Sequence, residues 1–442
     1  MAAIPLIRHN DPASVFAWCA GQPVSAAHFL HDVAQLAKRL PDKRHILNLC
    51  TDRYRFAVGF AAALSRGQVS LLPPNYTADF VARLNLRYPD TYCLTDGATD
   101  LPGVEIVAFP EAFSGDAVAD VPLIAETQRA ALVFTSGSTG DPVAHEKSWG
   151  SLCEGAVAEA VRLGIAQNSG MAVLGTVPAQ HMYGLESSML LAMQNGLALV
   201  AERPFYPADI CARLTTLPRP RCLITTPVHL RTLLSEVTEL PPVEFVLCAT
   251  AHLAPQLASE AEARFAAPLY EIYGCTEAGM VASRRTTEGA DWRLLPGVEM
   301  LQDEQGCRVR GGHVEIEATL SDVIERNLDG TFMLHGRTAD LVNIAGKRTS
   351  LASLNHHLNA IPGVQDGVFL MPDDGDGAVT RPMAFAVAQD LSAEHILNAL
   401  RNSVDAVFLP RPLYLVDALP RNATGKLTRE SLLRLREQYA KK

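Results

Sequence analysis

Short apolar runs alternate along this chain with longer segments whose apolar residues recur at helical spacing. Apolar runs at 45–49 and 69–72 flank a helical pattern at 56–65. The same alternation returns later, with runs at 221–225, 244–248 and 269–273 and helical patterns at 227–236 and 255–265. A helix between two strands is the connection that parallel strands require. The alternation therefore predicts an α/β fold of stacked, mostly parallel sheets with flanking helices.

The pattern changes from about residue 292. Segments 312–318 and 330–335 alternate polar with apolar residues, as short antiparallel strands do, so we expect a small antiparallel, barrel-like part there. Two strand-like runs and two helical patterns follow at 367–370, 383–387, 351–360 and 393–402. The chain is thus expected to have a large N-terminal domain, residues 1–338, and a small α+β C-terminal domain, residues 339–442.

Composition restricts the kinds of partner and compartment. The net charge of −10 argues against a general nucleic-acid binder, which gains affinity by neutralising phosphates. No apolar run approaches the roughly 20 residues of a membrane span, and the first residues lack a signal-peptide pattern. The nine cysteines are scattered without a C-x-x-C pair, which argues against zinc and disulfides. We therefore expect a cytoplasmic protein.

A small polar loop follows the apolar run at 131–134. Residues 135–142 read TSGSTGDP, with two glycines, two serines and two threonines. Glycines let backbone N–H groups converge and hydroxyls add donors, so such a loop suits a polyphosphate. It matches neither the P-loop nor the dinucleotide-binding pattern. An ordinary polar turn is the alternative for the segment taken alone.

Further motifs follow this loop in a fixed order. They are PAQHMYG at 178–184, IYGCTE at 272–277, Asp322 with DG at 329–330, GRTAD at 336–340, and LPRNATGKLTR at 419–429. Together with the polar loop, they resemble the acyl-adenylate-forming superfamily of acyl-CoA synthetases, adenylation domains and luciferases. Each motif alone also suits an ordinary structural role; a Thr-Glu pair, for example, commonly caps a helix.

The resemblance implies a two-step reaction with ATP and Mg²⁺. A carboxylate attacks the α-phosphate of ATP and releases pyrophosphate, and a phosphopantetheine thiol then displaces AMP. Fixed donors, a cation and Mg²⁺ would stabilise the charge that develops on the phosphate oxygens. The thiol would belong to coenzyme A or to an acyl carrier protein.

By the same resemblance, each motif has a role at the nucleotide. The β- and γ-phosphates would be held by Thr135, Ser136, Gly137, Ser138, Thr139 and Gly140. Catalysis would depend on Lys426 bridging the α-phosphate and the substrate carboxylate, Thr276 donating to the α-phosphate and Glu277 binding Mg²⁺. Adenine would pack on Tyr273, and Asp322 with Arg337 would bind the ribose.

The acid would lie beside the nucleotide. Family analogy gives its pocket His181, Thr250, Ala251 and Gly274. Small residues leave depth and few polar groups suggest an apolar tail, so an aryl or medium-length acid is expected.

Two positions depart from the family pattern. Val143 follows Pro142 where a lysine is usual, and Asn343 stands where a second lysine is common. Lys147 is a candidate replacement for the cation missing at position 143. Because Lys426 lies on the C-terminal domain, the resemblance also implies a mobile lid with a hinge near Asp340.

The compact length and local details such as TDRYRF at 51–56 resemble the ligases of bacterial aryl-polyene and xanthomonadin-type pigment pathways, which load an aromatic acid onto an acyl carrier protein. The last 22 residues hold seven basic and two acidic side chains, a charge that suits an acidic carrier protein or the phosphates of coenzyme A. A solvated terminal helix is the alternative.

Two other functions remain open on the sequence. A stand-alone amino-acid adenylation domain would need an acidic residue for the α-amino group, and none can be assigned. A non-catalytic module that binds AMP or acyl-AMP would not need Lys426 and Glu277. In each case the partner is a small-molecule acid or nucleotide, with no nucleic acid and no membrane span.

Overall fold

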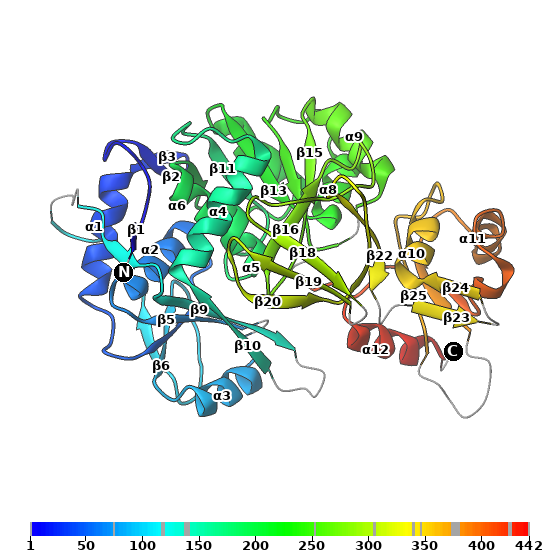
Figure 1. The fold of residues 1–442 in the computed structure, drawn as a ribbon, viewed down its shortest axis with the longest axis horizontal. Helices are drawn as coiled ribbons and strands as arrows, with labels where there is room; N and C mark the ends of the chain where they lie inside the picture. Colours follow the sequence, from blue (N-terminus) through cyan, green and yellow to red (C-terminus); the bar gives the residue numbers. More distant parts are fainter. Residues whose placement is uncertain are drawn as a thin grey trace.

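The computed structural model describes residues 2–73, 76–115, 120–136, 142–251, 253–303, 306–337, 341–344, 347–372, 381–422 and 427–440. Two large sheets dominate the N-terminal part (Figure 1). The smaller has the order β10-β9-β5-β4-β6-β7, at Pro142–Ser148, Arg129–Ser136, Val69–Leu72, His45–Asn48, Thr91–Thr95 and Glu105–Ala108. The larger has the order β17-β16-β15-β14-β13-β11-β12-β2-β3, at Arg293–Leu294, Gly279–Arg284, Leu269–Cys275, Val246–Cys248, Arg221–Thr225, Ala172–Gly175, Ala198–Val200, Val15–Cys19 and Gln22–Ser25.

Parallel pairing prevails inside both sheets. Strand β4 pairs parallel with β5 and β6, and β13 pairs parallel with β11 and β14. Antiparallel strands lie toward the edges, where β10 pairs with β9 and β16 with β15. This arrangement confirms the predicted α/β fold with mostly parallel sheets.

The helices form layers around these sheets. Their bounds are α1 Ala26–Ala37, α2 Arg53–Ser65, α3 Ala78–Arg87, α4 Trp149–Leu163, α5 Met182–Gly184, α6 Leu191–Asn195, α7 Pro207–Thr216, α8 Pro227–Glu236 and α9 Pro255–Phe265. Neighbouring residues of one strand pack into different layers, as Ile46 and Leu47 of β4 do. Ile46 joins the cluster shared with α1, α2 and α4, whereas Leu47 joins the cluster that holds α3 residues. Burial on both faces explains why the strands read as continuous apolar runs.

Small antiparallel sheets follow the second large sheet. One contains β18 Glu299–Asp303, β19 Gly306–Gly311 and β20 Val314–Leu320, and another pairs β21 Asp322–Arg326 with β22 Phe332–Arg337. The expected barrel-like part is therefore present as separate sheets. A further antiparallel pair joins β1 Ala3–Pro5 to β8 Leu123–Ala125.

The C-terminal part lies beside the larger body in Figure 1, drawn from yellow to red. It contains β23 Leu341–Ile344, β24 Lys347–Ser350, α10 Leu351–Asn359, β25 Asp366–Leu370, β26 Met383–Val387, α11 Ala393–Leu400, β27 Leu413–Leu415 and α12 Arg429–Ala440. Its apolar side chains form clusters separate from those of the N-terminal part, which extend no further along the chain than Leu334. These clusters agree with the expected boundary at 338/339, which stays a prediction. No helix within the described ranges is long and apolar enough to cross a membrane.

Candidate nucleotide and acid site

The hairpin of β9 and β10 carries the start of the polar loop. Thr135 lies at the end of β9 and pairs with Val143 of β10. The hydroxyl of Thr135 is 3.0 Å from Nε2 of His145, which lies two residues along β10. Val143 is 48% exposed, as a side chain at the mouth of this hairpin should be. Ser136 ends β9, while Gly137, Ser138, Thr139 and Gly140 lie outside the described residues.

The turn between β15 and β16 brings Glu277 toward this hairpin. Oε1 of Glu277 is 3.7 Å from Nε2 of His145, so one imidazole stands between Thr135 and Glu277. Burial lowers the pKa of His145, and the Glu277 carboxylate opposes part of that fall. Thr276 precedes Glu277 in the same turn and is partly exposed.

The turn is tight because of Gly274. A Cβ at this position would lie 2.3 Å from the carbonyl oxygen of Gly279, where the register of β15 and β16 shifts. A side chain at position 274 would therefore displace the segment that carries Thr276 and Glu277. This backbone role exists alongside the predicted role of Gly274 at the acid.

The Glu277 carboxylate fits a hard divalent cation. Its side chain is 42% exposed, and among the described residues its ion-pair partner is His145 rather than a lysine or arginine. Carboxylate and hydroxyl oxygens are the donors that Mg²⁺ prefers. Glu277 and Thr135 supply such oxygens on the two sides of His145.

Tyr273 and Asp322 meet although they were predicted from different motifs. The phenol of Tyr273 donates to Oδ2 of Asp322 over 2.6 Å. The ring also packs against Trp292 and Phe332, with centroid distances of 5.7 and 6.0 Å. Burial and the Asp322 charge raise the pKa of Tyr273, so it stays a donor at neutral pH. Arg337 is opposite Asp322 in the β21–β22 register.

The residues predicted for the acid gather at one edge of the larger sheet. Tyr183, two residues after His181, is hydrogen-bonded through its hydroxyl to the carbonyls of Thr225 and Leu247, near the carboxyl ends of β13 and β14. Thr250, with a φ of 81°, and Ala251 follow the end of β14. Ligands of parallel α/β sheets bind beyond the carboxyl ends of the strands.

The burial of two charged side chains near this edge, Lys147 and Glu186, was not predicted. Lys147 is 6% exposed, and its Nζ donates to the carbonyl of Glu277 over 2.7 Å. Its described partner is thus the β15–β16 turn, and the idea that Lys147 replaces the lysine missing at Val143 stays a prediction. Burial raises the pKa of Glu186 to about 7, while Lys147 opposes the rise. The sequence signal that could have revealed the position of Lys147 is the alternation His145-x-Lys147, which places both side chains on one face of β10.

Glu159 of α4 is a second unexpected acid. Its side chain is fully buried, and neither carboxyl oxygen has a hydrogen-bond partner among the described residues. Burial raises its pKa to about 8, with the neighbouring hydroxyl of Ser187 opposing part of the rise. Glu159 therefore adds a buried carboxyl group beside Ser187 and Glu186.

Lys426, Asp340 and Asp141 lie outside the described residues. For Arg337 the strand position is described but its side chain is not. The predicted roles of these residues stay predictions.

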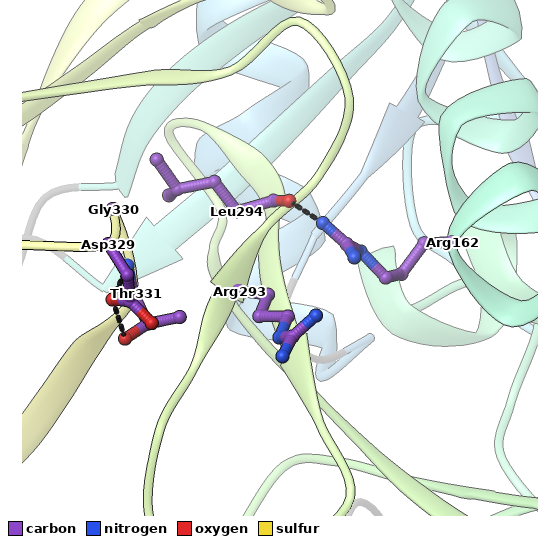
Figure 2. Close-up of a pocket in the computed structure, with 6 residues that line it drawn as sticks. All are labelled: Arg162, Arg293, Leu294, Asp329, Gly330 and Thr331. Carbon is purple, nitrogen blue, oxygen red and sulfur yellow. Dashed lines mark hydrogen bonds between the residues drawn. The ribbon is translucent and has the colours of Figure 1, made fainter.

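A pocket of about 350 Å³ lies elsewhere, between the end of α4 and the β21–β22 turn (Figure 2). It is lined by Arg162, Arg293, Leu294, Asp329, Gly330 and Thr331. Arg162 already donates to the carbonyl of Leu294, and Asp329 accepts from Thr331. Its lining is distinct from the residues predicted for nucleotide and acid.

The mostly parallel sheets, with a candidate site beyond the carboxyl ends of their strands, are typical of α/β enzymes. Residues 9–314 match the model of the family described as AMP-binding enzyme. The match covers well over half of the sequence, so the chain belongs to the AMP-binding enzyme family.

Curated relatives include named CoA ligases. The 4-coumarate–CoA ligase of Rhodobacter capsulatus is 30% identical over 244 residues, which cover 55% of this chain and 61% of that enzyme. The 2-succinylbenzoate–CoA ligase of Bacillus pumilus is 24% identical over 413 residues, covering 85% of this chain and 83% of the relative.

Solved structures share the fold over nearly the whole chain. The O-succinylbenzoate coenzyme A synthetase of Bacillus subtilis, in complex with ATP and magnesium ion, superposes with a TM-score of 0.83 at 18% identity, covering 96% of this chain and 97% of that one. ATP-bound MatB of Rhodopseudomonas palustris gives a TM-score of 0.81 at 18% identity, with coverages of 98% and 97%.

Proposed function

We propose that this protein is an ATP-dependent acid–thiol ligase. It activates an aromatic or medium-length carboxylic acid as its adenylate and transfers the acyl group to a phosphopantetheine thiol. The observation that supports this most directly is the convergence of Thr135, His145 and Glu277 beside the Tyr273–Asp322 pair. The names of the curated relatives, which include 4-coumarate–CoA and 2-succinylbenzoate–CoA ligases, support the same reaction type.

Glu277 holds Mg²⁺ in this proposal, and the metal supplies charge neutralisation at the phosphates. Thr276 donates to the α-phosphate, while Thr135 begins the loop that holds the β- and γ-phosphates. Tyr273 packs on adenine, and Asp322 accepts from the ribose hydroxyls, with its free lone pairs available beyond the Tyr273 bond. Each contact acts where charge must be stabilised or the nucleotide oriented.

Residues 339–442 act as a lid that carries Lys426, with Asp340 as the hinge. The lid presents Lys426 to the α-phosphate during adenylation and withdraws it for thioester formation. Separate apolar clusters on the two sides of residue 338 support a division at this point. Lys426→Ala should abolish adenylate formation while largely sparing thioester formation from supplied acyl-adenylate. Equal loss in both half-reactions would contradict the alternation.

The acceptor is the phosphopantetheine thiol of an acyl carrier protein or of coenzyme A. Helix α12 carries Arg434, which is exposed, and Arg436, which is partly exposed. Arg434 forms an ion pair with Glu430 at 2.5 Å, so part of its charge is already balanced. Arg434→Glu with Arg436→Glu should raise the KM for carrier protein and leave pyrophosphate exchange intact. An unchanged carrier KM would remove the carrier-docking role.

The test of this function follows the thioester itself. Purified protein is incubated with ATP, Mg²⁺ and a panel of aryl, fatty and amino acids, and with holo-acyl carrier protein or coenzyme A. Mass spectrometry of the acceptor should show an aryl or medium-chain acyl thioester. Activation of amino acids alone would favour an amino-acid adenylation domain. Nucleotide binding without any adenylate would favour a non-catalytic module.

A further inference from the structure

Two buried ionisable side chains, Lys147 and Glu186, lie against the turn that carries Glu277. Lys147 comes from β10, and Glu186 comes from a π-helical segment, Leu185–Leu190. Their exposed fractions are 6% and 4%. Each residue opposes the shift that burial imposes on the other's pKa. Burying two ionisable side chains costs free energy, because both groups lose their contact with water.

Both side chains contact one short turn. At the beginning of the turn, Nζ of Lys147 donates to the carbonyl oxygen of Glu277 over 2.7 Å. Toward its end, the Glu186 carboxylate lies beside the main chain of Gly279 and Met280. His313 adds a contact from the other side, with Nε2 2.6 Å from the carbonyl of Met280. The main chain from 277 to 280 is thus held at both ends.

Gly279 makes this approach possible. Its φ of +78° is in the left-handed region, and a Cβ built there would lie 2.7 Å from Oε1 of Glu186. A larger residue would therefore push the carboxylate away from the turn. The conformation of the turn and the position of the Glu186 carboxylate are therefore matched to each other.

Stability alone does not account for two buried ionisable groups beside one turn. Replacing a buried ion pair with apolar residues of similar volume is often neutral or stabilising, whereas removing one partner leaves a buried charge and is strongly destabilising. The Lys147 side chain donates a hydrogen bond to the main chain of Glu277, the residue whose side chain is proposed to hold the metal. Groups behind a metal ligand fix its orientation, and their loss costs about 10- to 100-fold in affinity.

We propose that Lys147 and Glu186 are positioning residues that clamp the 277–280 turn and thereby aim the Glu277 carboxylate at the metal–nucleotide complex. This inference rests on the proposed function. The two residues touch neither the metal nor the substrates, and they act through the main chain of Glu277 and Met280.

The test uses the apolar double variant Lys147→Met/Glu186→Leu in the full-length protein. Removing both charges together avoids stranding either of them. Mn²⁺ binding is measured by electron paramagnetic resonance in the presence of a non-hydrolysable ATP analogue, alongside urea unfolding. The variant should retain a urea midpoint close to that of the wild type and bind Mn²⁺ at least about tenfold more weakly. The KM for the acid should change little.

Two further variants separate positioning from general damage. Arg285→Met/Glu262→Leu removes an ion pair with a 2.8 Å contact that lies outside the site, and it should leave Mn²⁺ affinity unchanged. Glu186→Gln keeps a polar side chain of the same shape beside Gly279, so it should lose less Mn²⁺ affinity than Lys147→Met/Glu186→Leu.

A folded Lys147→Met/Glu186→Leu variant with wild-type Mn²⁺ affinity would overturn the clamp. Equal Mn²⁺ loss in the Arg285/Glu262 control would overturn it as well, since the effect would then be general. Wild-type protein that binds no metal–nucleotide complex would instead contradict the proposed function. The clamp, which rests on that function, would then be excluded as well. The wild-type measurement therefore distinguishes the two failures.

Discussion

The phenol of Tyr273 lies 2.6 Å from Oδ2 of Asp322, joining strand β15 of the larger sheet to strand β21 of a small antiparallel sheet. The two residues are 49 positions apart in the sequence. Trp292 and Phe332 pack on the same tyrosine ring and hold it in place. A nucleotide whose adenine packs on Tyr273 and whose ribose reaches Asp322 would therefore meet a preorganised surface.

Tyr273→Phe tests this surface with minimal loss of packing. The ring remains, but Asp322 loses one donor, and a hydrogen bond to a charged group contributes about 1.5–3 kcal/mol. We expect the KM for ATP to rise about tenfold in pyrophosphate exchange, with kcat less affected. Tyr270→Phe, on the same strand, is the matched control and should behave as the wild type. An ATP KM unchanged by Tyr273→Phe would exclude the pair from nucleotide binding.

His145→Val tests the imidazole that stands between Thr135 and Glu277. Valine suits a strand, so the fold should survive, but both contacts of Nε2 are lost. Without this link Thr135 and Glu277 can move independently. We expect apparent MgATP affinity, followed by thermal shift, to fall about tenfold. A variant that keeps the wild-type thermal shift with MgATP would show that His145 does not contribute to nucleotide binding.

Glu159 should make stability depend on pH. Its pKa is raised from 4.5 to about 8 by burial, so between these values the folded state holds a proton that the unfolded state has lost. Stability from this group is complete below about pH 4.5 and is lost as pH rises to about 8. The groups that face Glu159 are Glu186, Tyr183 and Cys222.

Glu159→Gln removes this titration. The free energy of unfolding of the variant, relative to wild type, should rise between pH 6 and pH 8 by up to about 1.4 kcal/mol per pH unit. Urea unfolding at both pH values measures the change. Glu154→Gln, an exposed position on the same helix, is the control. A difference independent of pH would contradict a protonated Glu159 in the folded state.

Asp366 joins the two parts of the chain. It receives two hydrogen bonds from Arg421, at 2.7 and 2.8 Å, and lies 3.7 Å from Arg231 of α8 in the larger body. Asp366→Ala should cost about 2 kcal/mol, because it removes the shared partner of both arginines. Arg231→Ala removes a longer, partly exposed contact and should cost less than about 1 kcal/mol. Equal urea-unfolding losses for the two variants would show that Arg231, not Arg421, dominates at Asp366.

The regular elements were predicted most accurately where a proline suited to a helix start was followed by apolar residues at helical spacing. Helices α8 and α9 begin at Pro227 and Pro255, where proline suits the first helical turn, and both were predicted to the residue. Strand β10 was not predicted, because its polar residues His145, Glu146 and Lys147 resemble a solvated segment.

The sequence predicted which motifs contribute to the site but not which of their side chains contact one another. The meeting of Tyr273 with Asp322 depends on the packing of separate sheets, which local pattern does not encode. The burial of the charged residues Lys147, Glu186 and Glu159 was not predicted, and the reason is physical. Charged residues are almost always exposed unless paired, so a sequence gives no ground for placing them inside.

The central claim is tested most directly by acid-dependent exchange of labelled pyrophosphate into ATP. The account predicts that label enters ATP only when an aryl or medium-length acid is present. It also predicts that Glu277→Gln and Lys426→Ala each reduce the exchange by about 100-fold or more. Nucleotide binding without exchange for any acid, or exchange untouched by both substitutions, would contradict it.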